Sequence, residues 1–162
     1  MAETLGSLVD KLSIKNLRIW HIEEELESGL LDKKCASDLR TKKGLAEKQR
    51  DELIEEINTF LALALEGKVR VRDQKLKLYQ NLNVANVERL KKLGSAISEL
   101  AIRNIRLWHL EDEVRRSDIP DSQVASCKRQ IDTQNQERND LMDKVDQILE
   151  AKTDEKNSGF QD

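Results

Sequence analysis

One phrase occurs twice in this chain, and the repetition constrains the fold more than any other feature. The segment around Trp20-His21 (residues 14–25) recurs around Trp108-His109 (residues 102–113), 88 positions later. At the same offset, Leu5-Gly6-Ser7 matches Leu93-Gly94-Ser95. Because a repeat of this kind is one structural unit used twice, the sequence predicts two similar halves.

The composition indicates that both halves are helical. The chain of 162 residues has one Pro, six Gly, 3% aromatic residues and 36% charged residues, which is typical of long amphipathic helices. Apolar residues recur with the helical period of 3.6 and predict helices at about 3–28, 32–65 and 84–117, and from Pro120 to about 152. Thr4 or Glu3 is expected near the start of the first helix, Asp32 is the expected N-terminal cap of the second, and Gly29 and Gly67 follow the expected helix ends.

These elements predict an all-α protein, a four-helix bundle made of two duplicated, pseudo-symmetric helical hairpins. The first hairpin is expected at residues 1–66 and the second at 84–152. A polar linker, residues 67–83, joins them, and residues 153–162 are expected to form a disordered tail.

Polar side chains interrupt the apolar stripes at matching places in the two halves. Buried polar groups persist only when they are hydrogen-bonded or paired, so the sequence predicts a buried polar layer that fixes register, with ligand binding as the alternative. If the first and third helices are antiparallel, Glu23 can pair with Arg138 and Glu111 with Arg50; if they are parallel, the two glutamates lie at one level. The layer consists of Asn16, Glu23, Arg50, Asn104, Glu111 and Arg138.

A second, weaker apolar face contains both histidines. His21 with Glu24, and His109 with Asp112, resemble a reversed form of the Glu-x-x-His motif of di-iron bundles. Trp20 and Trp108 are expected to pack at equivalent places in the core. Both histidines are predicted to point away from the tryptophan stripe, and Arg50 and Arg138 in the bundle interior would repel a cation, so no metal site is expected. Exposed apolar strips mark contacts, and the predicted interface, covered by another chain or by the linker around residues 76–79, consists of Ile14, Leu17, His21, Ile102, Ile105 and His109.

Several function classes find no support in the sequence. The net charge of -3, with both signs interspersed, offers no basic surface to nucleic acid. The longest apolar run, residues 60–65, is far shorter than the roughly 20 residues of a membrane helix. Cys35 and Cys127 lack redox or metal spacing, no phosphate loop or nucleophile motif is present, and no cofactor is expected. Because the chain opens without a signal-like segment, we expect a cytoplasmic protein.

The second half also carries a family resemblance. The segments Leu107-Trp108-His109-Leu110-Glu111-Asp112, Ile119-Pro120-Asp121 and Asn135-Gln136-Glu137-Arg138 resemble DUF4254, a bacterial domain family of unknown function. The first half is similar at Trp20-His21-Ile22-Glu23 and Gln49-Arg50-Asp51, but departs from the pattern at Glu24 and Lys43. The resemblance implies a helical protein without an established activity, cofactor or substrate.

Together these features favour a non-enzymatic structural or partner-binding module, whose partner is another protein or a second copy. The alternative is a small-ligand or metal-binding bundle, with or without enzymatic activity, that uses the polar layer or the Trp-His-x-Glu segments.

Overall fold

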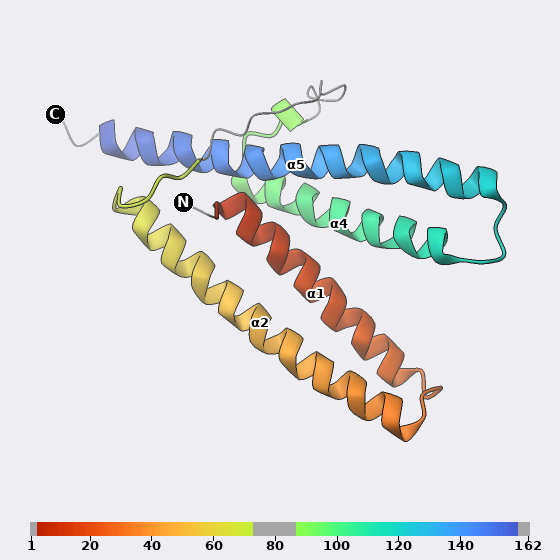
Figure 1. Ribbon diagram of the computed structural model, residues 1–162. Coiled ribbons are helices and arrows are strands. Elements are labelled where there is room, and N and C mark those ends of the chain that lie inside the picture. Colours follow the sequence, from red (N-terminus) through yellow and green to blue (C-terminus); the bar gives the residue numbers. More distant parts are fainter. Residues whose placement is uncertain (1–2, 73–86, 159–162) are drawn as a thin grey trace.

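The structure, a computed structural model, describes residues 3–72 and 87–158 and contains four long helices in two hairpins (Figure 1). Helices α1 (Leu5–Glu27) and α2 (Lys33–Leu65) form the first hairpin, and α4 (Leu93–Arg115) and α5 (Asp121–Ser158) form the second. The described residues contain no strand. The predicted all-α, four-helix architecture is confirmed.

The ends of the first hairpin's helices follow from local sequence. The Thr4 side chain accepts a hydrogen bond from the Ser7 amide, and the Ser7 hydroxyl accepts one from the Thr4 amide, which forms a capping box at the start of α1. The Asp32 carboxylate caps α2 by accepting a hydrogen bond from the Cys35 amide at 2.7 Å. Gly29 and Gly67 follow the helix ends with φ of +69°, a conformation that favours glycine.

The helix starts in the two hairpins, and the ends of α1 and α4, fall at the sequence offset of 88. Helices α1 and α4 both have 23 residues and start at Leu5 and Leu93, while α2 and α5 start at Lys33 and Asp121. Two bounds differ from the sequence analysis: α4 starts at 93 rather than near 84, and α5 continues to Ser158, so residues 153–158 are helical rather than a tail. Residues 73–86 lie outside the described residues; they include the greater part of the predicted linker and the segment 76–79 that was one predicted cover of the second apolar face.

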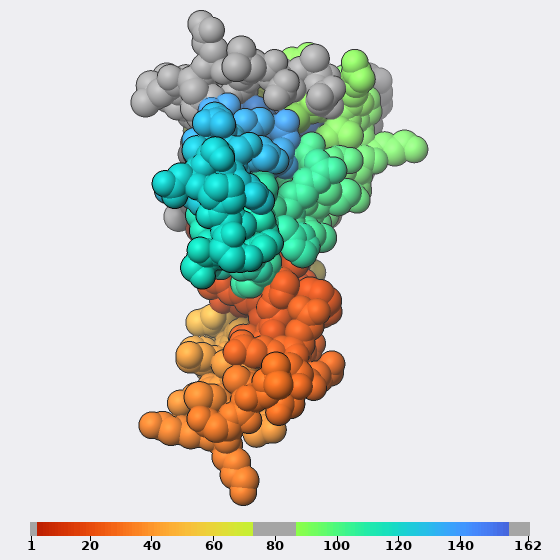
Figure 2. Space-filling model, turned by 90° about the vertical axis from the view of Figure 1, so that its right-hand side faces the viewer, coloured from red at the N-terminus to blue at the C-terminus, as the bar shows by residue number. Residues whose placement is uncertain are grey.

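The two hairpins diverge from a shared end (Figure 1). Helix α1 packs along α2, and α4 along α5, while α1 also contacts α4 and α5. Figure 1 shows that α1 and α4 begin at the same end of the molecule and run in the same general direction, so the first and third helices are parallel rather than antiparallel. Figure 2 looks towards the hairpin turns and shows the first hairpin, in orange, projecting away from the second, in teal and blue.

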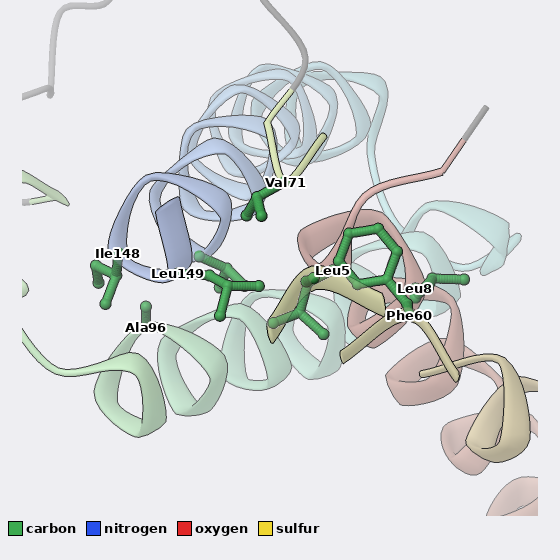
Figure 3. Packing of buried hydrophobic residues seen from close by; sticks show 9 residues of the cluster. Leu5, Leu8, Phe60, Val71, Ala96, Ile148 and Leu149 are labelled. Carbon is green, nitrogen blue, oxygen red and sulfur yellow. The ribbon is translucent and has the colours of Figure 1, made fainter. Parts of the chain in front are cut away.

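The main core lies at the shared end (Figure 3). There the first turns of α1 and α4 meet the last turns of α2 and α5, and the buried side chains are Leu5, Leu8, Phe60, Ala64, Val71, Ala96, Val145, Ile148 and Leu149. Towards the turn of the first hairpin fewer side chains are buried, since Ala46 is the one buried residue of α2 between its start at Lys33 and Phe60. The distal part of the first hairpin is therefore a two-helix arm that no third element of the described residues covers.

A close contact holds α1 against α5. The amide of Gly6 donates to Oδ1 of Asp146 at 2.7 Å, and Asp146 is 1% exposed. A Cβ atom on Gly6 would lie 2.2 Å from the Met142 carbonyl oxygen, whereas one on Gly94 would meet nothing within 4 Å. Only glycine therefore permits this approach at position 6, and the contact fixes how the hairpins join.

The segment after α2 adds a second tie to α5. Val71 is buried in the main core, and the Arg72 guanidinium donates two hydrogen bonds of 3.2 Å to the Asp143 carboxylate. This pairing raises the pKa of Arg72. The shared end is thus held by apolar packing, by the hydrogen bond from the Gly6 amide to Asp146 and by the ion pair between Arg72 and Asp143.

Candidate partner-binding face

The six residues predicted as a polar layer do not form one layer in the single chain. Asn104 is buried at 3% exposure and Arg138 is half-buried, but Asn16 and Glu111 are exposed. Glu23 pairs with Lys43 at 2.8 Å on the surface of the first hairpin, and Arg50 pairs with the neighbouring Asp51. The expectation of a buried set of six is therefore incorrect for the chain described here.

The buried polar contact centres instead on Asp10, which is not among the six predicted residues. Asp10 is 3% exposed and accepts a hydrogen bond from Asn104 Nδ2 at 3.0 Å. Arg138 donates to both oxygens of the same carboxylate, from Nε at 2.7 Å and from Nη2. This bidentate pairing raises the pKa of Arg138. One carboxylate of α1 thus joins α4 and α5.

The two halves differ at this carboxylate, which explains why the layer is not duplicated. The position equivalent to Asp10 is Ser98, which is exposed and carries no charge, so Arg50 has no counterpart of the Asp10 contact. The other carboxylate of the hairpin junction, Asp146, likewise has Asn58 at its equivalent position. In each case the sequence signal is a carboxylate that lacks a charged counterpart 88 positions away.

The predicted equivalence of the two tryptophans is also wrong. Trp20 is 51% exposed, whereas Trp108 is half-buried and stacks on His21, with ring centroids 4.3 Å apart and planes inclined by 9°. His21 lies 3.1 Å from Glu24, and His109 is exposed. Trp20 is not a core residue because it lies on the outer side of α1 and α4, which no described helix covers.

An apolar groove occupies this outer side of α1 and α4. Its volume is about 410 Å³, and Trp20 and Ile105, the latter 42% exposed, stand on opposite helices along it. Two residues of the predicted interface, Leu17 and Ile105, line it. The full lining is Val9, Leu12, Ser13, Asn16, Leu17, Trp20, Ile97, Ala101 and Ile105, and we call this surface the α1–α4 face.

A smaller and more polar cavity of about 210 Å³ lies where α1, α4 and α5 meet. Asn104, Glu111 and Arg138 of the predicted polar layer line it together with Arg18, Arg115, Asn135 and Trp108. Of the predicted interface, Ile14 and Leu17 also reach it, whereas the half-buried Ile102 lies in neither cavity. The structure therefore brings half of the predicted layer to one cavity.

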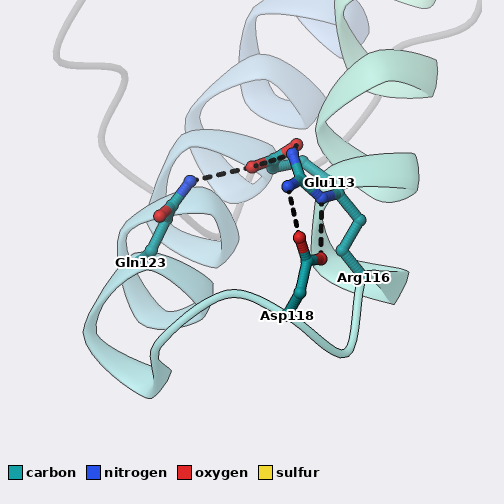
Figure 4. Close-up of polar contacts among 4 residues, drawn as sticks. All are labelled: Glu113, Arg116, Asp118 and Gln123. Carbon is teal, nitrogen blue, oxygen red and sulfur yellow. Dashed lines mark hydrogen bonds and ion pairs between the residues drawn. The ribbon is translucent and has the colours of Figure 1, made fainter.

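The turn of the second hairpin carries a charged cluster of its own (Figure 4). Arg116 donates to Glu113 at 3.0 Å and to Asp118 at 2.8 Å, and Gln123 donates to Glu113 at 2.8 Å. These pairings raise the pKa of Arg116 and lower that of Asp118. Because Arg116 and Gln123 both donate to the half-buried Glu113, the cluster links the two ends of the turn between α4 and α5.

Within the residues that the structure describes, no three His, Cys, Asp or Glu side chains are grouped so that they could hold a metal ion. Cys35 is exposed and Cys127 is buried, and neither is in a disulfide. None of the described helices has an apolar stretch of the length that a bilayer crossing requires.

The family model described as "Protein of unknown function (DUF4254)" matches residues 1–72 and 94–160. The chain belongs to the DUF4254 family. The match covers both hairpins, so the resemblance carried chiefly by the second half extends to the first. No curated protein and no solved structure is significantly similar to the chain. The family thus identifies the fold unit of this DUF4254 protein without assigning it an activity.

Proposed function

We propose that this DUF4254 protein is a cytoplasmic, non-enzymatic helical module that binds a protein partner through the α1–α4 face. The observation that supports the proposal is the exposure of Trp20, 51% of its surface, beside an apolar groove of about 410 Å³. Large aromatic side chains are enriched at the centres of interfaces, where they fill pockets on the partner. An exposed Trp next to an apolar hollow has the make-up of such a centre.

The position of the face on the fold also supports binding. It is built on two helices whose first turns are held in the main core and by the Asp10 and Asp146 contacts. Rigid elements present side chains more precisely than loops do, so Trp20 and Ile105 keep their separation without a partner. The partner therefore meets a face that is already formed.

The test is photo-crosslinking in the cell of origin. Benzoylphenylalanine replaces Asn16, an exposed residue in the middle of the groove lining, and a control variant carries it at Leu45, which is 58% exposed on α2 and outside the groove. We expect a protein adduct from position 16 and little or none from position 45. Equal labelling, or no protein adduct from position 16, would refute a dedicated binding face.

A small anionic ligand remains a second candidate function because three arginines converge on the smaller cavity. Arg18, Arg115 and Arg138 line it with two asparagine amides, and guanidinium groups bind carboxylates and phosphates. A thermal-shift series with inorganic phosphate and with citrate tests the idea. A rise in Tm that Arg18→Gln abolishes would favour a ligand.

A further inference from the structure

We propose that the smaller cavity, where α1, α4 and α5 meet, binds the zwitterion of an apolar α-amino acid, with its ammonium group at Glu111 and Asn135 and its carboxylate at Arg18. This inference rests on the second function proposed above, a ligand in this cavity, and names the class of that ligand. It differs from a simple anion because the ligand must also carry a positive group.

The lining of the cavity contains charges of both signs, and only some of them have a partner within the chain. Arg138 is already bound to the buried carboxylate of α1, and Arg115 donates to Asp112 at 2.9 Å. Arg18 and Glu111 also line the cavity, but neither forms an ion pair with a residue that the structure describes. Both side chains are exposed, so a molecule in solution can reach them. The charges left for a ligand are thus a cation on α1 and an anion on α4.

The first hairpin shows what a glutamate at the position of Glu111 binds. Its equivalent, Glu23, pairs with the ammonium group of Lys43 at 2.8 Å, and the carboxylate of Glu47 lies 3.4 Å from the same ammonium. The hydrogen bond to Glu23 raises the pKa of Lys43, as expected of an ammonium ion beside a carboxylate. The two glutamates therefore hold a primary ammonium group.

The second hairpin keeps hydrogen-bond acceptors at both positions but not the lysine. At the offset of 88, Glu111 and Asn135 stand in place of the two glutamates, and both line the cavity. The position equivalent to Lys43 is Ile131, a buried apolar residue. A carboxylate and an amide oxygen both accept hydrogen bonds from an ammonium group. The cavity thus offers acceptors like those that hold Lys43, and an ammonium group from outside completes them.

The carboxylate of the ligand is assigned to Arg18. A guanidinium group binds a carboxylate through two parallel hydrogen bonds, as Arg138 does with Asp10 in the same part of the fold. Arg115 lies one turn after Glu111 on α4 and lines the same cavity, so it adds positive charge there. An α-amino acid carries its ammonium and carboxylate groups on one carbon atom. It can therefore bridge side chains of opposite charge that line one small cavity.

The rest of the lining indicates a small ligand with an apolar side chain. The volume of about 210 Å³ is below the roughly 300 to 1,000 Å³ of sites for drug-sized ligands. Ile14, Leu17, Leu107 and Trp108 supply apolar surface, and the stack on His21 holds the Trp108 ring in place. Burial of an apolar side chain against this surface favours binding.

The test is isothermal titration calorimetry of the full chain with L-leucine, L-methionine and L-phenylalanine. Each is compared with two analogues that lack one charged group; for L-leucine these are 4-methylpentanoate, without the ammonium, and 3-methylbutylamine, without the carboxylate. We expect at least one amino acid to bind at least about tenfold more tightly than both of its analogues, because each analogue loses a charged hydrogen-bonded contact.

Variants of the exposed residues locate the site. Glu111→Gln and Arg18→Gln should each raise the dissociation constant at least about tenfold. The sequence repeat supplies the controls Glu23→Gln and Arg106→Gln, which make the same changes outside the cavity and should leave the dissociation constant unchanged. Circular dichroism checks that every variant is folded. Equal effects at the paired positions would overturn the assignment of the site.

The same titrations separate the zwitterion from the anion proposed for this cavity. Binding of inorganic phosphate or citrate without binding of the amino acids overturns the zwitterion and leaves an anion site in place. A carboxylic acid analogue that binds as tightly as its amino acid has the same meaning. No binding of the amino acids, phosphate or citrate overturns both. The crosslinking test at Asn16 stays independent, because that residue lines the larger groove alone.

Discussion

Replacing Arg138 with methionine tests the buried contact that joins the two hairpins. The variant would leave the Asp10 carboxylate, 3% exposed, with the Asn104 amide at 3.0 Å but without its cation. Removing one partner of a buried ion pair costs about 3 to 5 kcal/mol. Because the Arg138 side chain is 26% exposed and water reaches the pair, we expect a loss of about 2 to 4 kcal/mol in the free energy of unfolding.

The sequence repeat supplies a matched control. Arg50 occupies the equivalent position in the first hairpin, but its partner is the adjacent Asp51, whose side chain is 64% exposed. The same chemical change, Arg50→Met, should therefore alter the free energy of unfolding by less than about 0.5 kcal/mol. Urea denaturation at unchanged m-value provides both measurements.

A double-mutant cycle identifies the partner. Asp10→Leu combined with Arg138→Met should recover at least about 1 kcal/mol relative to the sum of the single changes, because the pair is then removed together. Cycles of Arg138→Met with Glu23→Leu or Glu111→Leu should be additive within about 0.5 kcal/mol. Equal losses from Arg138→Met and Arg50→Met, or additivity with Asp10→Leu, would refute the junction described here.

Three further outcomes follow from the same structure. Gly6→Ala should destabilise the fold by about 1 to 3 kcal/mol or more through the clash with the Met142 carbonyl, while Gly94→Ala should be neutral or stabilising; thermal melting compares the two. Asp32 has a pKa lowered below 3.8 by the hydrogen bond from the Cys35 amide, so its contribution to stability is present above pH 3.8 and is lost as the pH falls through the lowered value. The Tm difference between wild type and Asp32→Ala should shrink in that acidic range. Amide hydrogen exchange should be faster across residues 20–45 than at residues 141–149, because the distal arm buries few side chains.

The helical period predicted the elements well because each element is determined locally. Apolar spacing placed all four helices, and the caps at Thr4 and Asp32 and the ends before Gly29 and Gly67 depend on contacts within a few residues. These signals need no knowledge of the neighbouring helices. The helical period predicts a start for α4 near residue 84, earlier than the observed Leu93, because the apolar and charged residues before Leu93 also fit a helical pattern.

The candidate site was harder to predict because a periodic stripe shows which side of a helix is apolar but not what covers it. The stripe of α1 includes Trp20 and so predicts a core residue, yet Trp20 is 51% exposed because no described helix covers that side of α1 and α4. Asp10 lies one residue, about 100° around the helix, from Val9 of that stripe. It is buried only because α4 and α5 both approach α1 there.

The divergence of the hairpins itself follows from charges that only one half carries. In a symmetric bundle, every contact between α1 and α5 would have a counterpart between α4 and α2. The two carboxylates that hold α1 to α5, Asp10 and Asp146, have the uncharged Ser98 and Asn58 at the equivalent positions. Helix α4 thus offers no carboxylate to Arg50, and α2 offers none to the amide at Gly94. Helix α1 therefore packs on α5 while α4 lacks the matching contact with α2, and no described helix covers the outer side of α1 and α4 that carries Trp20.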